Sequence, residues 1–416
     1  MIVLRAAPIV LLLAVKLPAA DPPTPLSALL QEATQNNPDI RAARSAWQAA
    51  AQVPSQVSTR PDPQVTVQNL SVGSPRPFAG FSNSEFAYIG FGISQDLPYP
   101  GKLKLKGEAA QQDAAIDRDR LEGVRLGVVG QLKEAYFQIA YLQQTLEVLE
   151  RNGKLLEEIE RIADARYRVG QGTQQDVLRA QLERTKLLLE IEHHHGAMNT
   201  QQALIRKLLN RPPGSANITA EPLVETPVRY SSDELLAKAR VSNADVSESR
   251  EMVKRQSLGL EMVRKDRYPD FNLQYMWQHT DEQFRDYYVL SFSARLPVYR
   301  RRKLNAEMAQ SVEELNQARR EYESQVQSVF FDVRNQYIAA ETASQMLKIY
   351  REGLIPQAFA TYQAGLASYQ TGRLDFESLF STFMDVLNFD SEYWKTLMEH
   401  ETALARIEQI TGAQLN

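Results

Sequence analysis

Residues 85–102 read EFAYIGFGISQDLPYPGK, and within them the residue pattern changes from that of a strand to that of a helix. Up to Leu97 the residues alternate with the two-residue period of a β-strand. One face carries Ala87, Ile89, Phe91 and Ile93, and the other carries Phe86, Tyr88, Gly90, Gly92, Ser94 and Asp96. After Pro98-Tyr99-Pro100-Gly101 the period becomes that of a long helix. The stretch therefore predicts a strand over Glu85–Leu97 that leads directly into a helix.

A second strand is predicted immediately upstream. Gln64–Val72 follows Arg60-Pro61-Asp62 and has β-branched residues alternating at Val65 and Val67. A loop rich in Gly, Ser and Pro (Gly73–Ser84) separates it from the strand over Glu85–Leu97. Together these segments indicate a strand–loop–strand unit.

The same series recurs about 200 residues later, after Pro269-Asp270. Here two alternating runs flank the polar segment Thr280–Arg285, and Leu296-Pro297 precedes a second helical pattern. Their apolar positions are Phe271, Leu273, Tyr275 and Trp277, then Tyr288, Leu290, Phe292, Ala294 and Leu296. Solenoid repeats are usually about 20–50 residues long, so this is a duplicated half-protein.

Each half contains one very long helical tract. Lys102 to Tyr167 spans 66 residues, about 100 Å as one helix, and Lys303 to Tyr369 is nearly as long. Both have apolar residues spaced alternately by three and four, which is typical of coiled-coil packing. The two seams are Val128, Leu132, Ala135, Ile139, Leu142, Leu146, Leu149 and Phe330, Val333, Tyr337, Ala340, Ser344, Leu347.

Shorter helices complete each half. The tracts end in glycine-bearing turns and return as Gln174–Leu209 and Phe376–Thr411. These are too short to cover the outgoing helices, so we expect Leu26–Thr59, broken near Asn36-Asn37-Pro38, and Ser232–Arg267 to cover the remainder. The predicted organisation is 1–20 signal peptide, 21–210 first repeat, 211–231 linker and 232–416 second repeat.

The four strands pose a problem that several copies of the chain would solve. Isolated hairpins are marginal in water, and in lipid strands span only as a closed barrel. Each strand has about ten residues, near the ~9–11 that a tilted transmembrane strand needs. Bacterial barrels need about eight strands or more, so four are too few. Three copies would supply twelve.

Composition excludes several function classes. The 416 residues carry a formal net charge of −4 without a concentrated basic block, which argues against a nucleic-acid partner. The absence of cysteine excludes disulfides and thiolate chemistry. No phosphate-binding loop or nucleophile–base signature stands out, so we expect neither an enzyme nor a cofactor. Arg5, the apolar Ile9–Val15 and Pro18-Ala19-Ala20 indicate an export signal over 1–20.

His193-His194-His195 suggests a metal site but is a poor one. Successive residues on a helix point about 100° apart, so one helix cannot present all three to one ion. We predict a solvated face and no resident metal.

The chain resembles the TolC-type outer-membrane efflux proteins. The resemblance rests on the duplicated architecture, on the junction from Ser94 to Lys102, and on Tyr167-Arg168-Val169-Gly170 leading to Asp176-Val177-Leu178-Arg179-Ala180-Gln181. The junction is also similar to the branch that serves heavy-metal resistance pumps. The resemblance implies an α+β fold, in which a homotrimer forms a twelve-stranded β-barrel in the outer-membrane lipid and a coiled-coil helical tunnel in the periplasm. It also implies a periplasmic adaptor and an inner-membrane pump, with the RND type as one candidate.

The resemblance places the adaptor contacts at the tip turns, at Tyr167, Gly170, Tyr369 and Gly372. Gly170 and Gly372 also fit ordinary helix-terminating glycines, Thr173 to Asp176 is an N-capping pattern, and Asp375 can cap at the equivalent position. These structural roles are compatible with adaptor contact. The family's gate aspartates align with Ser378 and Ser381 here, so that match fails. Asp176, Asp375 and Glu377 are the substitute gate candidates, and solvated carboxylates at helix starts are the alternative.

The predicted function is a passive outer-membrane exit duct in a tripartite efflux system. Ile89, Phe91, Leu290 and Phe292 would then face lipid. The main alternative is a periplasmic coiled-coil scaffold without channel activity, in which protein must cover these side chains. A secreted carboxylate hydrolase would need a compact catalytic domain, which the sequence does not indicate.

Overall fold

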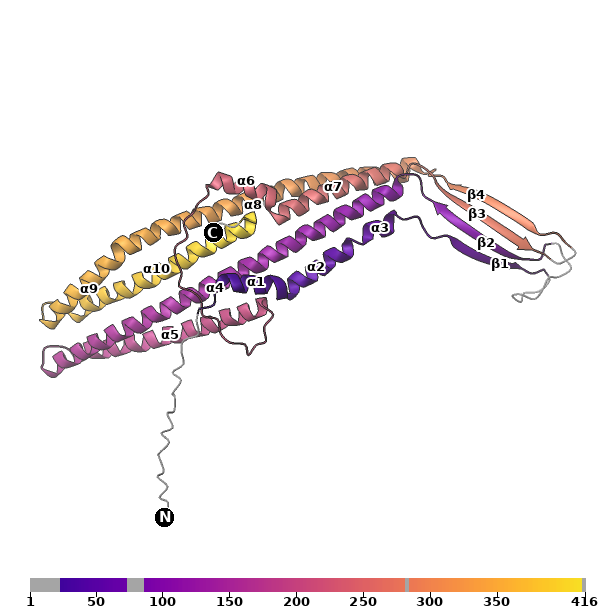
Figure 1. Cartoon of the computed structure of the whole chain (residues 1–416). Helices are drawn as coiled ribbons and strands as arrows, with labels where there is room; N and C mark the ends of the chain where they lie inside the picture. Colours follow the sequence, from indigo (N-terminus) through magenta and orange to yellow (C-terminus); the bar gives the residue numbers. More distant parts are fainter. Residues whose placement is uncertain (1–22, 73–85, 281–283, 414–416) are drawn as a thin grey trace, which may run out of the picture.

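The computed structural model describes residues 23–72, 86–280 and 284–413. The predicted signal segment 1–20, the whole of the loop Gly73–Ser84 and part of the turn Thr280–Arg285 lie outside these residues. Figure 1 shows a long molecule with a small sheet at one end and two helical hairpin turns at the other. The architecture is α+β, as predicted.

The sheet is antiparallel, with the order β1-β2-β3-β4. Its strands are β1 (Gln64–Leu70), β2 (Tyr88–Leu97), β3 (Asp270–His279) and β4 (Tyr287–Arg295). All four were predicted, and their bounds differ from the predictions by at most three residues. The β2–β3 pairing joins the two halves of the chain into one sheet.

Strand register sorts the side chains onto two faces. Paired residues of an antiparallel sheet point to the same side, and Val67 pairs with Phe91, which pairs with Trp277. Tyr275 likewise pairs with Leu290. This face is apolar, and the opposite face carries Gln64, Thr66, Gln68, Gly90, Gly92, Ser94, Asn272, Gln274, Ser291 and Ser293.

Met276 interrupts the polar face of the sheet for a steric reason. Its side chain is 5% exposed and packs over Gly90 and Gly92. A Cβ added at Gly92 would lie 3.1 Å from the Met276 methyl carbon, which is tighter than ordinary contact. The two glycines thus provide the space that this methionine fills.

The helices follow the predicted order. They are α1 (Leu26–Asn36), α2 (Pro38–Ala50), α3 (Val53–Ser58), α4 (Lys102–Arg168), α5 (Gln174–Leu208), α6 (Ser232–Ser242), α7 (Ala244–Lys265), α8 (Asn305–Ile349), α9 (Ile355–Gln370) and α10 (Phe376–Thr411). Among the described residues, no helix is both long enough and apolar enough to cross a lipid bilayer.

The second outgoing tract departs from the prediction of one regular helix. Two π-helical segments, η1 (Arg300–Leu304) and η2 (Tyr350–Leu354), flank α8, whereas α4 is α-helical over 67 residues. Pro356 explains η2, because proline lacks the N–H for a regular bond and its ring clashes with the carbonyl four residues earlier. The first half has no proline at the corresponding place in α4.

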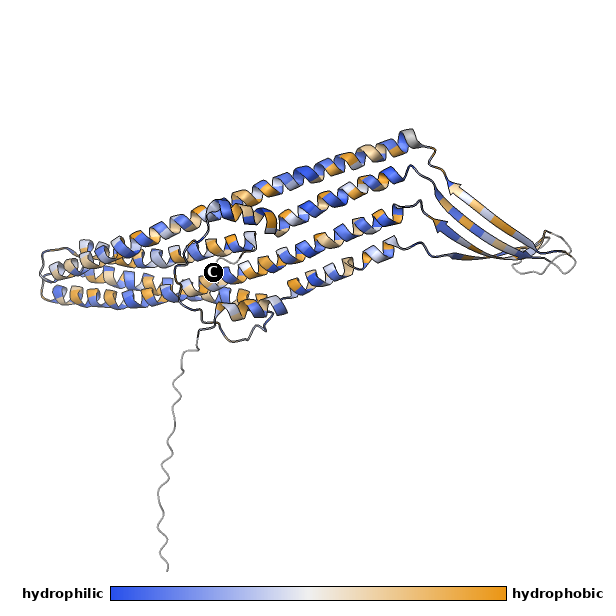
Figure 2. Cartoon of the chain, turned by 45° about the horizontal axis from the view of Figure 1, so that its top comes forward, coloured by the Kyte–Doolittle hydropathy of each residue, from blue (hydrophilic) through white to orange (hydrophobic). Residues whose placement is uncertain are grey.

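The helices pack in a layer around α4 (Figure 1). Near the tips, α5 lies along α4 and α10 lies between α4 and α8–α9; nearer the sheet, α2, α3 and α7 lie along α4. The shorter helices therefore cover the length that the return helices leave open, as predicted. In Figure 2, hydrophobic and hydrophilic residues alternate along these helices. Most seam positions are buried, among them Leu132, Ile139, Val333 and Leu347.

An asparagine links each helix break to the end of its return helix. The Asn37 side chain accepts the Asp39 N–H at 2.9 Å, and its amide donates to the Leu208 carbonyl at 2.9 Å. Asn243 repeats both contacts, with Val246 N–H and the Ile410 carbonyl, each at 2.9 Å. These asparagines cap one helix and satisfy the end of another.

The linker ties the second half together near its middle. Glu225 accepts from Ser344 Oγ at 2.8 Å and pairs with Arg351 in η2 at 3.2 Å. The Thr226 carbonyl lies 2.8 Å from His400 Nε2, while His400 Nδ1 lies 2.9 Å from the Ala340 carbonyl.

Glu401 is a buried carboxyl beside this linker, and it predicts a pH dependence of stability. Burial raises its pKa above the usual 4.5, against the opposing hydrogen bonds from Thr226 N and Oγ1 and the nearby His400. The folded chain therefore binds this proton more tightly than the unfolded chain. The protonated Glu401 therefore contributes to stability in full below the pKa that it has in the unfolded chain. This contribution is lost as the pH rises through its pKa in the folded chain.

Glu401→Gln should remove that dependence. We expect the free energy of unfolding of the variant to rise relative to wild type as pH increases above about 4.5. Chemical denaturation of both proteins across the pH range measures the difference. A difference that stays constant with pH would contradict the assignment of Glu401.

Candidate functional site

The two hairpin turns at the far end of the helices have the same backbone geometry. Gly170 and Gly372 have φ of 73° and 74°, and each donates its N–H at 3.0 Å to the carbonyl of a tyrosine three residues earlier, Tyr167 or Tyr369. Such positive φ angles favour glycine, which ends a helix in this way. The predicted helix-terminating role of both glycines is confirmed.

Carboxylates cap the returning helices. Thr173 and Asp176 form a capping box at the start of α5, with Thr173 Oγ1 donating to Asp176 Oδ1 at 2.8 Å. Asp375 accepts the Ser378 N–H at 2.8 Å at the start of α10. That hydrogen bond lowers the pKa of Asp375, so its carboxylate stays ionised at neutral pH. The Ser378 hydroxyl also donates to Asp375 Oδ2 at 3.0 Å.

Arg166 connects the two turns. Its guanidinium lies 4.6 Å from the centroid of the Tyr369 ring and donates to the Tyr369 carbonyl in the second turn. It also donates to the Gln171 carbonyl of its own turn at 3.0 Å. One side chain thus satisfies carbonyl groups in both turns. Arg166 was not among the predicted tip residues, because a basic residue in the last turn of a helix is too common a signal to single it out.

A second arginine joins the returning helices. Arg179 of α5 forms a two-pronged pair with Glu377 of α10, and one of its N···O distances is 2.9 Å. Both partners remain partly exposed, so the pair is a surface contact of modest energy. Glu377 is therefore already paired within one chain.

Tyr167 and Tyr369 have different surroundings in spite of their equivalent places. Tyr167 is 45% exposed, whereas Tyr369 is 2% exposed and packs against Phe376. Burial raises the pKa of Tyr369, so its hydroxyl stays neutral. Of the four predicted tip residues, Tyr167 alone presents a substantial side chain at the surface.

The apolar face of the sheet is open at the predicted positions. Phe91, Leu290 and Phe292 are 49%, 71% and 66% exposed, while Ile89 is partly buried. The Phe292 ring stacks on Phe271 at 5.4 Å. This face presents aromatic and aliphatic side chains that no described residue covers.

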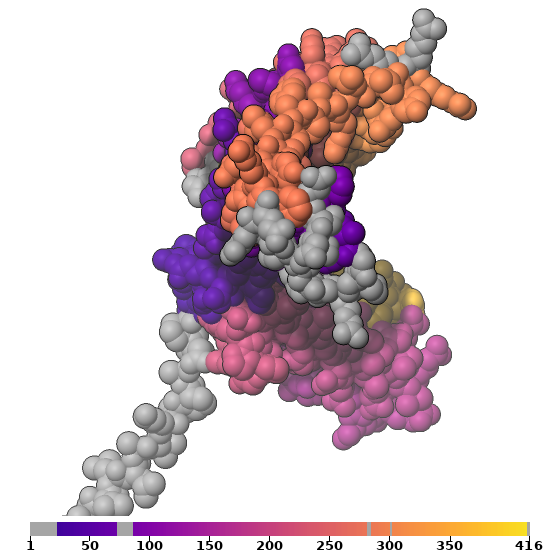
Figure 3. Space-filling view, turned by 90° about the vertical axis from the view of Figure 1, so that its right-hand side faces the viewer, coloured from indigo at the N-terminus to yellow at the C-terminus, as the bar shows by residue number. Residues whose placement is uncertain are grey.

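Two long helices also carry exposed apolar stripes. On α5, Leu178, Leu182 and Leu189 are each more than half exposed, and their spacings of four and seven residues place them on one face. On α8, Phe331, Ile338 and Ile349 are similarly exposed and share a face. Figure 3 shows that the chain forms an open arc, hollowed on one side. Among the described residues, these stripes remain open to solvent.

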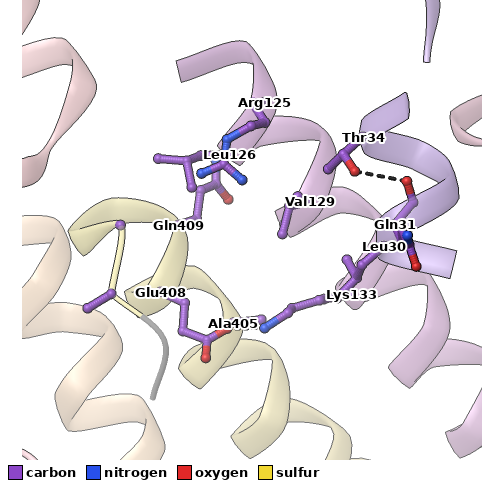
Figure 4. Close-up of a pocket in the computed structure, with 13 residues that line it drawn as sticks. Leu30, Gln31, Thr34, Arg125, Leu126, Val129, Lys133, Ala405, Glu408 and Gln409 are labelled. Carbon is purple, nitrogen blue, oxygen red and sulfur yellow. Dashed lines mark hydrogen bonds and ion pairs between the residues drawn. The ribbon is translucent and has the colours of Figure 1, made fainter. Parts of the chain in front are cut away.

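A cavity of about 290 Å³ lies between α1, α4 and α10 (Figure 4). Lys133 and Glu408 point toward each other across it and form an ion pair, while Leu126 and Val129 belong to its wall. Because Lys133 and Glu408 pair with each other, we assign no ligand to this cavity.

The histidine run lies on α5. His194 Nδ1 is 2.9 Å from the Glu190 carbonyl of its own helix. His193 and His195 are exposed, and His194 is partly buried. Among the residues that the structure describes, no three His, Cys, Asp or Glu side chains form a group able to hold a metal ion.

Comparison with known proteins gives matches over nearly the whole chain. The family model described as outer membrane efflux protein matches residues 29–211 and again 235–411. The cobalt-zinc-cadmium resistance protein CzcC of Cupriavidus metallidurans is 23% identical over 322 residues, covering 75% of this chain and 74% of that protein.

Solved outer-membrane proteins share the fold. The channel OprN has a TM-score of 0.81 at 16% identity, covering 94% of this chain and 90% of that chain. VceC from Vibrio cholerae has a TM-score of 0.78 at 16% identity, covering 94% and 97%. The double match of one family model agrees with the internal duplication, and an efflux family supports the prediction of a transport protein rather than an enzyme.

Proposed function

Because this chain belongs to the outer membrane efflux protein family, we propose that it is the outer-membrane exit duct of a tripartite efflux system. Its place in the outer membrane and its efflux role follow from the family. A four-stranded sheet with one open apolar face stands at the end of about 100 Å of helix, and this arrangement supports the role of an exit duct.

The sheet supports assembly as a homotrimer. In the order β1-β2-β3-β4, strands β1 and β4 are edges that pair on one side only among the described residues. Unpaired edges are not tolerated in lipid. Pairing β4 of one copy with β1 of the next removes every edge, and three copies give a twelve-stranded barrel. The apolar face, with Ile89, Phe91, Leu290 and Phe292, then faces lipid and the polar face lines the lumen.

The helices support a tunnel below that barrel. The stripes on α5 and α8 are apolar surfaces of coiled-coil spacing on one arc, and a second copy of the chain has the matching surface. Three arcs placed side by side would enclose a channel. Each chain contributes two similar units, 21–210 and 232–416, which are joined by the linker 211–231. Three chains therefore supply six such units.

The tips are the proposed docking end and gate. A periplasmic adaptor would contact the turns at Tyr167, Gly170 and Gly372, with the buried Tyr369 supporting the second turn from inside. Arg166 and Arg179 hold the two hairpins of one chain together, and Asp176, Asp375 and Glu377 place carboxylates at the entrance. We propose that this set of contacts stabilises the closed entrance.

The energy for transport would come from an inner-membrane pump, with the RND type as one candidate. The name of the relative CzcC refers to cobalt, zinc and cadmium resistance, which favours divalent metal ions as the cargo. Adaptor, pump and cargo are parts of the same proposal.

Reconstitution tests this function. We expect the protein to require detergent for extraction, to migrate as a trimer, and to conduct ions in a planar lipid bilayer. Size-exclusion chromatography with light scattering measures the mass, and single-channel recording measures the conductance. A monomer that stays soluble without detergent would support the scaffold alternative instead.

A further inference from the structure

Basic residues gather where the helices meet the sheet. Segments 101–106, 264–270 and 295–304 lie at the start of α4, at the end of α7, and from the end of β4 through η1. They contain three, three and five basic residues, whereas the whole chain carries a net charge of −4. We call these three segments the basic collar.

The collar segments contain only two acids. They are Asp266 and Asp270, and Lys102 binds both, with N···O distances of 3.2 and 3.0 Å. Asp270 also accepts the Tyr99 N–H at 2.8 Å. Lys102 is thus a structural member, and the other basic residues give the collar its net positive charge.

Both halves of the chain contribute to the collar at equivalent positions. Lys104 stands six residues after Pro98, and Lys303 stands six residues after Pro297. Each contacts a glutamate one turn further on, Glu108 at 3.5 Å and Glu307 at 3.8 Å. Both lysines are more than 70% exposed, so these contacts are weak and leave the ammonium groups open to a further anion.

The collar also has an exposed apolar wall. A cavity of about 340 Å³ is lined by Leu296, Val298 and Tyr299 together with Arg295 and Lys303. These three apolar or aromatic side chains are 64%, 71% and 78% exposed. Such side chains beside basic groups are unfavourable in water and suited to the boundary between lipid tails and headgroups.

The collar lies at the height where a membrane would end. The apolar face of the sheet stops at the residues that enter the helices, so headgroups on the helical side would meet the collar. We propose that the basic collar binds the headgroup phosphates of anionic phospholipids in the periplasmic leaflet, with Leu296, Val298 and Tyr299 against the acyl chains. This inference rests on the proposed outer-membrane barrel.

The chemistry favours this one occupant. The apolar wall and the positive charge lie together at the helical end of the sheet, an arrangement that matches the boundary between acyl chains and anionic headgroups. Cationic side chains near an anionic membrane each gain about 1 kcal/mol, roughly a fivefold preference. In a trimer, the equivalent positions Lys104 and Lys303 would occur six times around the axis.

The test uses the full-length protein purified in detergent and transferred to nanodiscs. One set contains phosphatidylcholine alone and the other contains phosphatidylcholine mixed with phosphatidylglycerol. Native mass spectrometry counts the lipids that stay bound. We expect wild type to retain phosphatidylglycerol at least about tenfold over phosphatidylcholine, and K104Q/R302Q/K303Q to lose that preference.

A matched variant controls for net charge. R319Q/R320Q/K348Q removes the same charge from exposed positions of α8 outside the collar, and it should keep the preference. Equal loss in both triple variants, or no preference in wild type, would overturn the proposal. Displacement of the lipid by millimolar inorganic phosphate would identify a free-phosphate site instead. Failure to form a trimer or to enter nanodiscs at all would count against the barrel, before the collar is tested.

Discussion

Leu290→Arg should prevent the chain from entering the outer membrane, whereas Ser291→Arg should not. The register places Leu290 opposite Tyr275 on the apolar face, and Ser291 opposite Gln274 on the polar face. An arginine on the lipid face costs about 2–4 kcal/mol near the middle of a bilayer, and a trimer would bear that cost three times. In the lumen an arginine remains in water, so Ser291→Arg costs little.

The two neighbouring variants control for each other, since they add the same residue to adjacent places in one strand. Membrane fractionation and the amount of detergent-extracted trimer give the first measurement. For Ser291→Arg, single-channel recording should show a shift toward anion selectivity, because the added charges line the pore. Equal yields of trimer from the two variants would show that the apolar face does not face lipid and that the polar face does not line the lumen.

Arg166→Ala should open the entrance. The substitution removes donors to the carbonyls of Tyr369 and Gln171 and the contact with the Tyr369 ring, which together hold the two hairpin turns. Hydrogen bonds to a charged group contribute about 1.5–3 kcal/mol each, and about 1.4 kcal/mol changes an equilibrium tenfold. We expect the open state in planar bilayers to become at least about tenfold more populated.

Arg168→Ala is the matched control for Arg166→Ala. Arg168 pairs with Asp164 of the same helix at 2.7 Å and is 75% exposed, so its loss removes the same charge two residues away without releasing the second turn. Thermal unfolding should change little in either variant because the helices keep their seams. Unchanged conductance in Arg166→Ala would contradict the role of Arg166 in closing the entrance, as would an equal increase in Arg168→Ala.

Much of this molecule can be predicted from local pattern. The alternation from Phe271 to Trp277 predicts a strand, and the seam from Val128 to Leu149 predicts a coiled-coil helix, because each period matches the geometry of one element. The capping of α5 by Thr173 and Asp176 is equally local, since it involves residues three apart. The duplication can be predicted because the same local patterns occur twice along the chain.

Contacts between the halves could not be predicted in the same way. Arg166 and Tyr369 are 203 residues apart, and Arg179 and Glu377 are 198 apart. Arginines and glutamates are common on every long helix, so the sequence does not say which of them meet. The burial of Tyr369, against the exposure of Tyr167, likewise depends on the packing of Phe376 from α10.

The four strands can be predicted from the residue pattern, and so can the long helices, their turns and caps, and the family resemblance. The folded chain is needed to see that β2 pairs with β3, that Met276 fills the space above two glycines, and which arginines hold the tips. The two groups of features differ in the range of the interactions that produce them. Hydrogen bonding and side-chain period act over a few residues, whereas the partner of a strand edge or a guanidinium is chosen by the packing of helices that the chain brings together from both halves.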